Sequence, residues 1–331
     1  CVTHGWTVDG EGKAMHKSLG NGVDPADVFN ENGADILRLW AASADYHADV
    51  RCSKEIFKQL SQNYLKFRNT CKFMLDNLVD FDPEKLTKPE DMPVLDRWLL
   101  TKLNELIEKA EQSYCDYEFH IITHAVNDFC VNTLSSFYLD IVKDRLYCEG
   151  AESATRRSAQ TALYLTLHTL SKLFAPILAF TCDEIWLAMP HTGDDDARNV
   201  VLNEMNKPFT AYALTAEEMA NWEKLAEVRT VVNGVLEAAR AEKKIGKSLE
   251  ADVHLTVPAE DAFLANVDGK ELADLLIVSQ VEVTVGDSVK ASAEEAAGTK
   301  CPRCWKHSTA ANAEGLCPRC AEVMRSFPDL A

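Results

Sequence analysis

Four cysteines near the end of this sequence have the spacing of a metal site. They form two C-x2-C turns, each filled by Pro-Arg and separated by twelve residues, and comprise Cys301, Cys304, Cys317 and Cys320. Two such turns place four sulfurs at the corners of a tetrahedron around Zn²⁺. A pair of redox dithiols or two disulfides would use the same residues, and iron would accept the same four thiolates. We expect zinc, because a redox C-x-x-C motif is seldom doubled, and a structural role, because the protein fills every coordination position.

A glycine-rich loop near the start of the chain has the residue types that act on phosphate. Residues 9–21 read Asp-Gly-Glu-Gly-Lys-Ala-Met-His-Lys-Ser-Leu-Gly-Asn, with Lys17 and Ser18 between glycines. A lysine on such a loop can fold over a polyphosphate and neutralise the charge that develops at the transferred phosphorus. Taken alone the pattern is weak, because Gly, Lys and Ser are also common in solvated turns.

Long helices must position these two features. Asp24-Pro25 predicts the start of a short helix, and Ser53 can cap a longer one that stops at the Asp80-Phe-Asp-Pro83 segment. Apolar residues at steps of three and four predict further helices over about 94–114, 119–147 and 154–175, the last broken by Pro176. Each helix has one apolar face and a short polar connection to the next. The fold class is therefore mainly α, with an antiparallel helical bundle.

The pattern changes in the second half of the chain. Thr215 and Glu218 form a capping box at the start of a helix that we expect to run to about Lys244. Apolar and polar residues then alternate over 253–257 and 281–285, which predicts two strands with a helix between them. An Ala- and Glu-rich stretch over 288–299 would join this small α+β unit to a C-terminal zinc ribbon or knuckle.

Composition limits the class of protein. The 331 residues carry a net charge of -18, which argues against a protein that coats nucleic acid without specificity. Residues 300–325 hold five bases against two acids, so a selective contact with RNA is compatible with the sequence. Eleven cysteines, seven of them scattered singly, indicate a reducing compartment. No apolar run predicts a membrane span and no secretion leader is evident, so we expect a cytoplasmic protein.

The lysine loop and several later motifs resemble one family. Met15-His-Lys-Ser-Leu-Gly-Asn21 is similar to the Lys-Met-Ser-Lys-Ser loop of class I aminoacyl-tRNA synthetases. Segments resembling the bacterial isoleucyl branch follow in that family's order; they are Gly33–Trp40, Ser136–Tyr147, Ala175–Phe180 with Asp183–Trp186, and Glu242–Ala251. The Lys300-Cys-Pro-Arg-Cys-Trp305 knuckle is typical of that branch and not of its valyl or leucyl relatives. The resemblance covers essentially the whole chain.

The resemblance implies a two-step ligation. Members of the family activate isoleucine with ATP and Mg²⁺ to an adenylate and transfer it to the 3′ end of tRNA(Ile). By this resemblance Lys17 is the catalytic residue and binds the ATP phosphates together with Met15, His16 and Ser18. Residues from about 53 to 186 would bind the anticodon, and the zinc module would support tRNA contact. The expected partners are tRNA(Ile), ATP and isoleucine, with no membrane, and the expected form is a monomer.

The same resemblance divides the chain into four predicted domains. Residues 1–52 would be the end of the class I catalytic core with its signature loop, and residues 53–190 the helical anticodon-binding bundle. Residues 191–290 would form a connecting region with the long helix and the small α+β unit. Residues 291–331 would form the zinc-binding module.

The sequence departs from the family pattern in two ways. Ala14 stands where the family usually has its first lysine and His16 where it has serine, although Lys13 could partly compensate. The sequence also contains no His-Ile-Gly-His-type motif, no nucleotide-binding Rossmann core and no editing insertion. We therefore expect this chain alone not to aminoacylate tRNA. The alternative reading is a stand-alone zinc-ribbon and helical module that binds RNA or a protein without catalysis.

Overall fold

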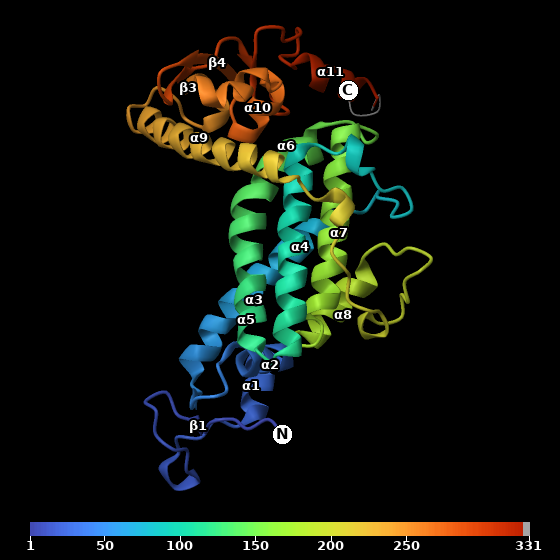
Figure 1. Cartoon of the computed structure of the whole chain (residues 1–331), viewed down its shortest axis with the longest axis vertical. Helices are drawn as coiled ribbons and strands as arrows, with labels where there is room; N and C mark the ends of the chain where they lie inside the picture. The colour runs from blue at the N-terminus through green and yellow to red at the C-terminus, as the bar shows by residue number, and fades with distance from the viewer. Residues whose placement is uncertain (327–331) are drawn as a thin grey trace. The chain divides into compact units, whose positions relative to one another are not determined.

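The computed structural model describes residues 1–326 and is mainly helical (Figure 1). The chain forms two compact units, one made of residues 1–138 and 157–213 and the other of residues 139–156 and 214 onward. Within residues 1–326, no helix combines the length and the apolar character needed to cross a membrane. The predicted fold class, mainly α with a small α+β part, is confirmed.

The first unit begins with a small α and β segment that carries the lysine loop. Its elements are β1 (Thr7–Val8), α1 (Pro25–Asn32), α2 (Ala34–Ser43) and β2 (Val50–Arg51), and the two strands pair in parallel. The Asp24 side chain caps α1 by accepting a hydrogen bond from the N–H of Ala26 at 2.9 Å, as the Asp-Pro pair predicts. Gly33 then separates α1 from α2 with a φ of 86°, a backbone conformation that favours glycine.

Long helices make up the rest of the first unit (Figure 1). They are α3 (Lys54–Asp76), α4 (Val94–Cys115), α5 (Phe119–Asp128), α7 (Ala154–Phe174) and α8 (Ala179–Ala188). The Ser53 hydroxyl caps α3 by accepting a hydrogen bond from the N–H of Ile56, as predicted. The helix ends at Asp76, one turn before the predicted stop at Asp80. Both α3 and α4 pack against α5, so the predicted bundle is present.

Buried polar contacts fix α2 to the bundle. The buried carboxylate of Asp35 accepts hydrogen bonds from the N–H and the hydroxyl of Thr181, at 2.7 and 2.6 Å, in the first turn of α8. An anion at a helix N-terminus is favoured by the unpaired N–H groups there. Arg38, one turn further along α2, donates to the carbonyls of Pro176 and Ile177, at the break that Pro176 causes between α7 and α8. The segment that carries the lysine loop therefore has a fixed attachment to the bundle.

A stretch of π-helix interrupts the bundle where a regular helix was predicted. Residues 119–147 are helical as expected, but Phe129–Tyr138 form the π-helix η3, in which each turn is wider than an α-helical turn. Side chains add local hydrogen bonds here, since the Asn132 amide donates to Asp128 at 2.5 Å and the Ser136 hydroxyl donates to the carbonyl of Asn132. The spacing of apolar residues gives no sign of this change, since it fits an α-helix equally well.

The second unit contains the small α+β part. Its first elements are α6 (Leu139–Cys148), α9 (Ala216–Ala241), β3 (Ala251–Pro258), α10 (Gly269–Leu276), β4 (Gln280–Gly286) and β5 (Lys290–Glu295). The capping box of Thr215 and Glu218 opens α9 as predicted. Strand β3 lies between β4, its parallel neighbour, and β5, its antiparallel neighbour. The predicted pair of strands with an intervening helix is confirmed.

Strand β5 replaces part of a predicted linker. We expected residues 288–299 to be a joining segment, but Lys290–Glu295 pair with β3 along its other edge. Ala and Glu are poor strand formers, so their local preference did not indicate a strand. Pairing with an edge already set by β3 and β4 outweighs that preference. This corrects the sequence prediction for this stretch.

Short elements complete the described chain. The C-terminal part holds β6 (Thr299–Lys300), β7 (His307–Ser308) and α11 (Pro318–Arg325). Single-turn helices are η1 (Lys17–Leu19), η2 (Pro89–Asp91), η4 (Val200–Leu202), η5 (Thr210–Tyr212) and η6 (Ser248–Glu250), and η7 (Ala259–Asn266) is longer. The division into four domains at residues 52, 190 and 290 stays a prediction.

Candidate functional site

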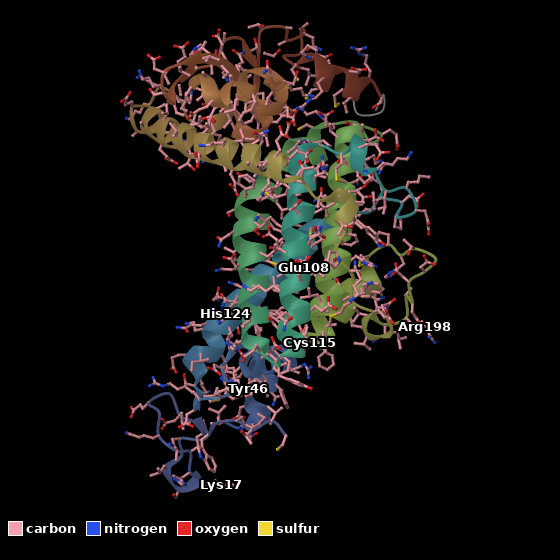
Figure 2. All side chains as sticks on the ribbon, viewed as in Figure 1. Lys17, Tyr46, Glu108, Cys115, His124 and Arg198 are labelled. Atoms are coloured by element: carbon pink, nitrogen blue, oxygen red, sulfur yellow. The ribbon has the colours of Figure 1, made fainter. Side chains whose placement is uncertain are left out.

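The lysine loop presents Lys17 to solvent at its tip. Lys17 begins the single turn η1, and its side chain is exposed, as are those of His16 and Ser18. Met15 instead packs against the buried cluster that contains Val28 and Phe57. Figure 2 shows Lys17 at the far end of this loop, away from the helices of the first unit. Met15 therefore anchors the loop while the next three residues project from it.

A contact between Asp9 and Asn21 closes the loop at its base. The Asn21 amide donates to the Asp9 carboxylate at 2.8 Å and accepts a hydrogen bond from the N–H of His16 at 2.9 Å. The backbone N–H of Lys13 donates to Asp9 at 2.8 Å. These hydrogen bonds, from Lys13 first and Asn21 second, lower the pKa of Asp9. No role was predicted for Asp9 or Asn21 from the sequence, although they stand at the two ends of the glycine-rich segment.

The cations of the loop differ in their surroundings. Lys13, which the sequence offered as a substitute for the missing lysine at Ala14, forms an ion pair with Glu11 at 2.7 Å. Both side chains are more than two thirds exposed, so the pair is weak but still occupies the ammonium group. Lys17 has no carboxylate partner within residues 1–326. The loop thus offers one unpaired ammonium group to an anionic ligand.

The four cysteines of the C-terminal turns come together. Their sulfur atoms all lie within 4.8 Å of one another, and those of Cys304 and Cys317 are 3.8 Å apart. A regular tetrahedron with Zn–S bonds of about 2.3 Å has sulfurs about 3.8 Å apart. Cys301 and Cys320 are fully buried and Cys304 nearly so. The donor set therefore fits a tetrahedral zinc ion.

The surroundings of one sulfur, that of Cys301, favour a thiolate, whereas burial raises the pKa of Cys304 and of Cys320. Burial alone would raise the pKa of Cys301, but the backbone N–H groups of Cys304, Cys317 and Arg303 point at its sulfur and lower the pKa to about 6. The C-x2-C turns therefore aim backbone N–H groups at this sulfur. A thiolate is the form in which cysteine binds a metal.

The two arginines of the C-x2-C turns hold the module to α6. Arg319 makes a bidentate contact with Asp144, at 2.5 and 2.8 Å, and Arg303 donates to the carbonyls of Tyr147 and Cys148 at the end of that helix. Arginine is suited to both roles, because its planar group donates in two directions and because carbonyls at a helix C-terminus lack partners. These arginines therefore act within the protein.

The remaining bases of the module are also largely paired. Lys300 contacts Glu250 at 2.6 Å, and Lys306 contacts Asp274. The sequence has an excess of basic residues over 300–325, which is compatible with a contact to RNA. In the structure, most of these bases bond to other groups of the second unit. Of the five bases, Arg303 and Arg325 have no carboxylate partner within residues 1–326, and Arg303 donates to backbone carbonyls instead.

Trp305 is the exposed aromatic residue of this region. Its side chain is half exposed, the Nζ atom of Lys247 lies 5.1 Å from the ring centre, and its backbone has a φ of 65°. A left-handed conformation is uncommon for a bulky residue. Because its side chain is half exposed, the ring is not a buried cover over the metal site.

Three family models match the chain in sequence order. Residues 1–53 match the tRNA synthetases of class I for isoleucine, leucine, methionine and valine (I, L, M and V), and residues 96–255 match the anticodon-binding domain of tRNA ligase. Residues 298–323 match the zinc finger found in FPG and IleRS. The zinc finger match covers the four cysteines described above, so this segment is a structural zinc module.

Similar proteins cover nearly the whole chain. The isoleucine–tRNA ligases of Moorella thermoacetica and Syntrophotalea carbinolica are each 44% identical to it over 98% of its length, and that of Caldicellulosiruptor saccharolyticus is 45% identical over 98%. The chain spans 36 to 37% of the length of these relatives. Identity at this level from end to end, with three matched segments in order, shows that the chain belongs to the isoleucine–tRNA ligase family of class I tRNA synthetases.

Proposed function

We propose that this chain is part of an enzyme that attaches isoleucine to tRNA(Ile). The carboxylate of isoleucine would attack the α-phosphorus of ATP, forming isoleucyl-adenylate and releasing pyrophosphate, and a terminal hydroxyl of the tRNA would then take the aminoacyl group and release AMP. One observation carries the proposal: the chain is 44% identical over 98% of its length to an isoleucine–tRNA ligase. ATP enters this reaction as its complex with Mg²⁺.

The lysine loop would act in the first step. Lys17 would place its ammonium group against the phosphates of ATP and stabilise the negative charge that grows on pyrophosphate as the bond to the α-phosphorus breaks. Ser18, His16 and the backbone of Met15 would line the same contact. The closed base at Asp9 and Asn21 supports this role, because it limits the positions that the tip can take.

The four cysteines would bind the zinc ion as thiolates. Cys301, Cys304, Cys317 and Cys320 fill all four positions, which leaves no place for a water molecule or a substrate. When bound, zinc would cross-link the two turns and stabilise a segment that has little hydrophobic core of its own. The arginine contacts to α6 would transmit that stability to the rest of the second unit.

Binding of tRNA is the property that tests the proposal directly. Fluorescence anisotropy with labelled tRNA(Ile) should show saturable binding to the 331-residue chain, tighter than binding of a tRNA with a different anticodon. We expect no aminoacylation by the chain alone, because the sequence lacks the motifs of the adenylate site. Equal affinity for every tRNA, or none for tRNA(Ile), would contradict the proposal.

Two further properties stay predictions. A single species of the monomer mass in light scattering is the expected result for oligomeric state. A cytoplasmic location is expected from the sequence and would be tested by fractionation of cells that express the protein.

A further inference from the structure

One corner of the four-cysteine cluster is open to solvent. Cys317 is partly exposed, whereas Cys301 and Cys320 are fully buried and Cys304 is nearly so. Cys317 directly precedes α11, at the end where the first N–H groups of a helix have no partner within it. Such a position stabilises a negative charge on sulfur. The four sulfurs are therefore unequal, and Cys317 is the one that a reagent from solvent reaches first.

A surface pocket of about 520 Å³ leads to this corner. Cys304 and Cys317 line it together with residues of α10, β4 and β7, and the other two cysteines of the cluster are not among the described residues that line it. The sulfur atoms of Cys304 and Cys317 lie 3.8 Å apart. A small molecule in the pocket therefore meets two sulfurs that are neighbours of each other.

The charged side chains along this pocket are basic. They are Lys270, Lys306 and Arg319, and no carboxylate lines the pocket within residues 1–326. Each of these bases also contacts an acid that lies outside the pocket lining, which holds the base in place. Positive groups beside a reacting sulfur stabilise the thiolate and the hydroxide ion that leaves when the thiolate attacks a peroxide. The pocket therefore favours the reaction of its two sulfurs with an oxidant.

Two other cysteines provide contrasts. Cys148, at the end of α6, packs against the cluster, but it is buried and its sulfur donates to the carbonyl of Arg303 at 3.8 Å. Cys115 is exposed, but it belongs to no group of metal-binding side chains within the described part of the chain. One lacks access and the other lacks a partner sulfur. Cys317 has both, with Cys304 as its neighbour.

We propose that Cys317 and Cys304 form an oxidation site, at which a hydroperoxide converts the two thiolates into a disulfide and thereby releases the metal. The proposal rests on the zinc site of the proposed function. The Cys317 thiolate would attack one oxygen of hydrogen peroxide, forming a sulfenic acid and releasing hydroxide. The Cys304 thiolate would then attack that sulfur, forming the S–S bond and releasing a second hydroxide. Two electrons pass from the two sulfurs to the peroxide.

This reaction would remove half of the zinc ligands. Cys301 and Cys320 remain, and two ligands do not make the four-coordinate site that a structural zinc ion occupies. The new disulfide would keep the two turns linked, while the buried sulfurs would lose the ion that they share. Thiolates from a reductant can attack the disulfide and regenerate both cysteines. The change is therefore reversible when reductant and zinc are supplied together.

Peptide mapping of the oxidised 331-residue chain tests the connectivity without any substitution. Trypsin cleaves at the basic residues between the four cysteines, so each cysteine of the cluster lies on a different peptide. After brief treatment with hydrogen peroxide and alkylation of the remaining thiols, we expect one released zinc ion for each disulfide between Cys304 and Cys317. Dithiothreitol with added zinc should restore the original metal content. Disulfides formed mainly within the two C-x2-C turns would overturn the inference.

A matched pair of variants tests which sulfur reacts first. Cys317→His keeps a set of three cysteines and one histidine, which also binds zinc, but it removes the accessible sulfur. The rate of zinc release by hydrogen peroxide, followed with a colorimetric chelator, should fall at least about tenfold in this variant. The control is Cys148→Ser, which removes the buried thiol beside the cluster and should leave the rate unchanged. Equal slowing in both variants would contradict the assignment to Cys317.

The outcomes separate this inference from the proposed function. A purified chain that contains no zinc, or that contains iron in its place, would contradict the zinc site of the proposed function. A chain that contains zinc and releases it equally fast in Cys317→His would overturn the inference alone, and the zinc site would stand. Oxidation of Cys115 with the zinc fully retained would overturn the inference in the same way.

Discussion

An ammonium group that must meet a polyphosphate has to be accessible and free of carboxylates, and Lys17 meets both conditions. Lys13, four residues earlier, meets only the first, because Glu11 occupies it. The loop residue that anchors this arrangement is Met15, whose side chain packs on the core. The difference between the two lysines is therefore set by their neighbours and not by their type.

Removal of the Lys17 ammonium group should impair the first chemical step. In the full-length enzyme that contains this chain, Lys17→Ala should lower the rate of ATP–pyrophosphate exchange by at least about a hundredfold, since one charged contact in a transition state is worth about 3 kcal/mol. The Lys13→Ala variant is the matched control and should lose less than about tenfold. An exchange rate in Lys17→Ala close to that of the wild type would refute the catalytic role.

The contact of Asp144 with Arg319 should make stability depend on pH. Burial would raise the pKa of Asp144, but the hydrogen bonds and charge of Arg319 outweigh it and lower the pKa. A lowered pKa stabilises the folded state above the unfolded pKa of about 4, and this stabilisation is lost as the pH falls through the folded pKa. We expect Asp144→Asn to destabilise the protein by about 2 kcal/mol at pH 7 and by less at pH 3.

The control for this variant is on the same helix. Asp140→Asn removes an acid that pairs with Lys143 at 2.9 Å, but both side chains are about half exposed. It should change the free energy of unfolding by less than about 0.5 kcal/mol at either pH. Urea denaturation at the two pH values gives both quantities. A loss in Asp144→Asn that does not shrink at low pH would show that the carboxylate charge is not its source.

At the scale of elements, the helix N-termini are the features that were best predicted from the sequence. The Thr215 hydroxyl accepts a hydrogen bond from the N–H of Glu218, and the Glu218 carboxylate accepts one from the N–H of Thr215. Such a box needs only two residue types three positions apart, so it can be seen without tertiary structure. Asp24 and Ser53 were predictable for the same reason.

Loss of the cap should destabilise α9 measurably. Thr215→Ala leaves the N–H of Glu218 without its side-chain partner and should cost about 1 kcal/mol in urea unfolding of the second unit. Thr230→Ala, an exposed position of the same helix whose hydroxyl bonds to the carbonyl of Ala226, is the control. It should be neutral or slightly stabilising, because alanine is the better helix former. Equal losses in both variants would contradict the capping account.

The elements that the sequence did not predict depend on partners distant in the chain. The π-helix from Phe129 to Tyr138 is held partly by contacts to other helices, such as the bond of Thr70 with Ser135 and the ring contact of Trp98 with Phe137. Strand β5 exists because β3 offers it an edge. Local pattern carries no information about either, since both arise only when separate segments meet.

At the scale of the whole molecule, three of the five bases over 300–325 form ion pairs with acids from other elements of the protein. The excess of five bases over two acids could be counted in the sequence, but the ion pairs that these bases form could not be predicted. The acids that pair with Lys300, Lys306 and Arg319 lie near β3, on α10 and on α6, respectively. The four cysteines, in contrast, were found by spacing alone, since all of their neighbours in the site lie within twenty residues. The features that could be predicted are those whose interacting residues lie close together in the sequence.

Removal of the metal should loosen the C-terminal segment first. We expect about one zinc ion per chain by elemental analysis, and chelation should make amide hydrogen exchange fast over residues 298–323 while the first unit stays protected. Cys304→Ser should do the same without a chelator. Cys115→Ser, which alters an exposed thiol outside the cluster, is the control and should retain the zinc. Iron in place of zinc, or amide hydrogen exchange over residues 298–323 that is unchanged after the metal is removed, would refute a structural zinc ion.

The contact between Asn21 and Asp9 depends on an asparagine that can deamidate over time. Asn21 is followed by Gly22, the pair in which the next backbone nitrogen most readily attacks a side-chain amide, releasing ammonia and leaving aspartate or isoaspartate after hydrolysis. The amide donor that faces Asp9 would then become a second carboxylate, and two like charges would repel across the base of the loop. Protein kept for long periods should therefore lose its hold on the Lys17 tip by deamidation while its helices remain intact.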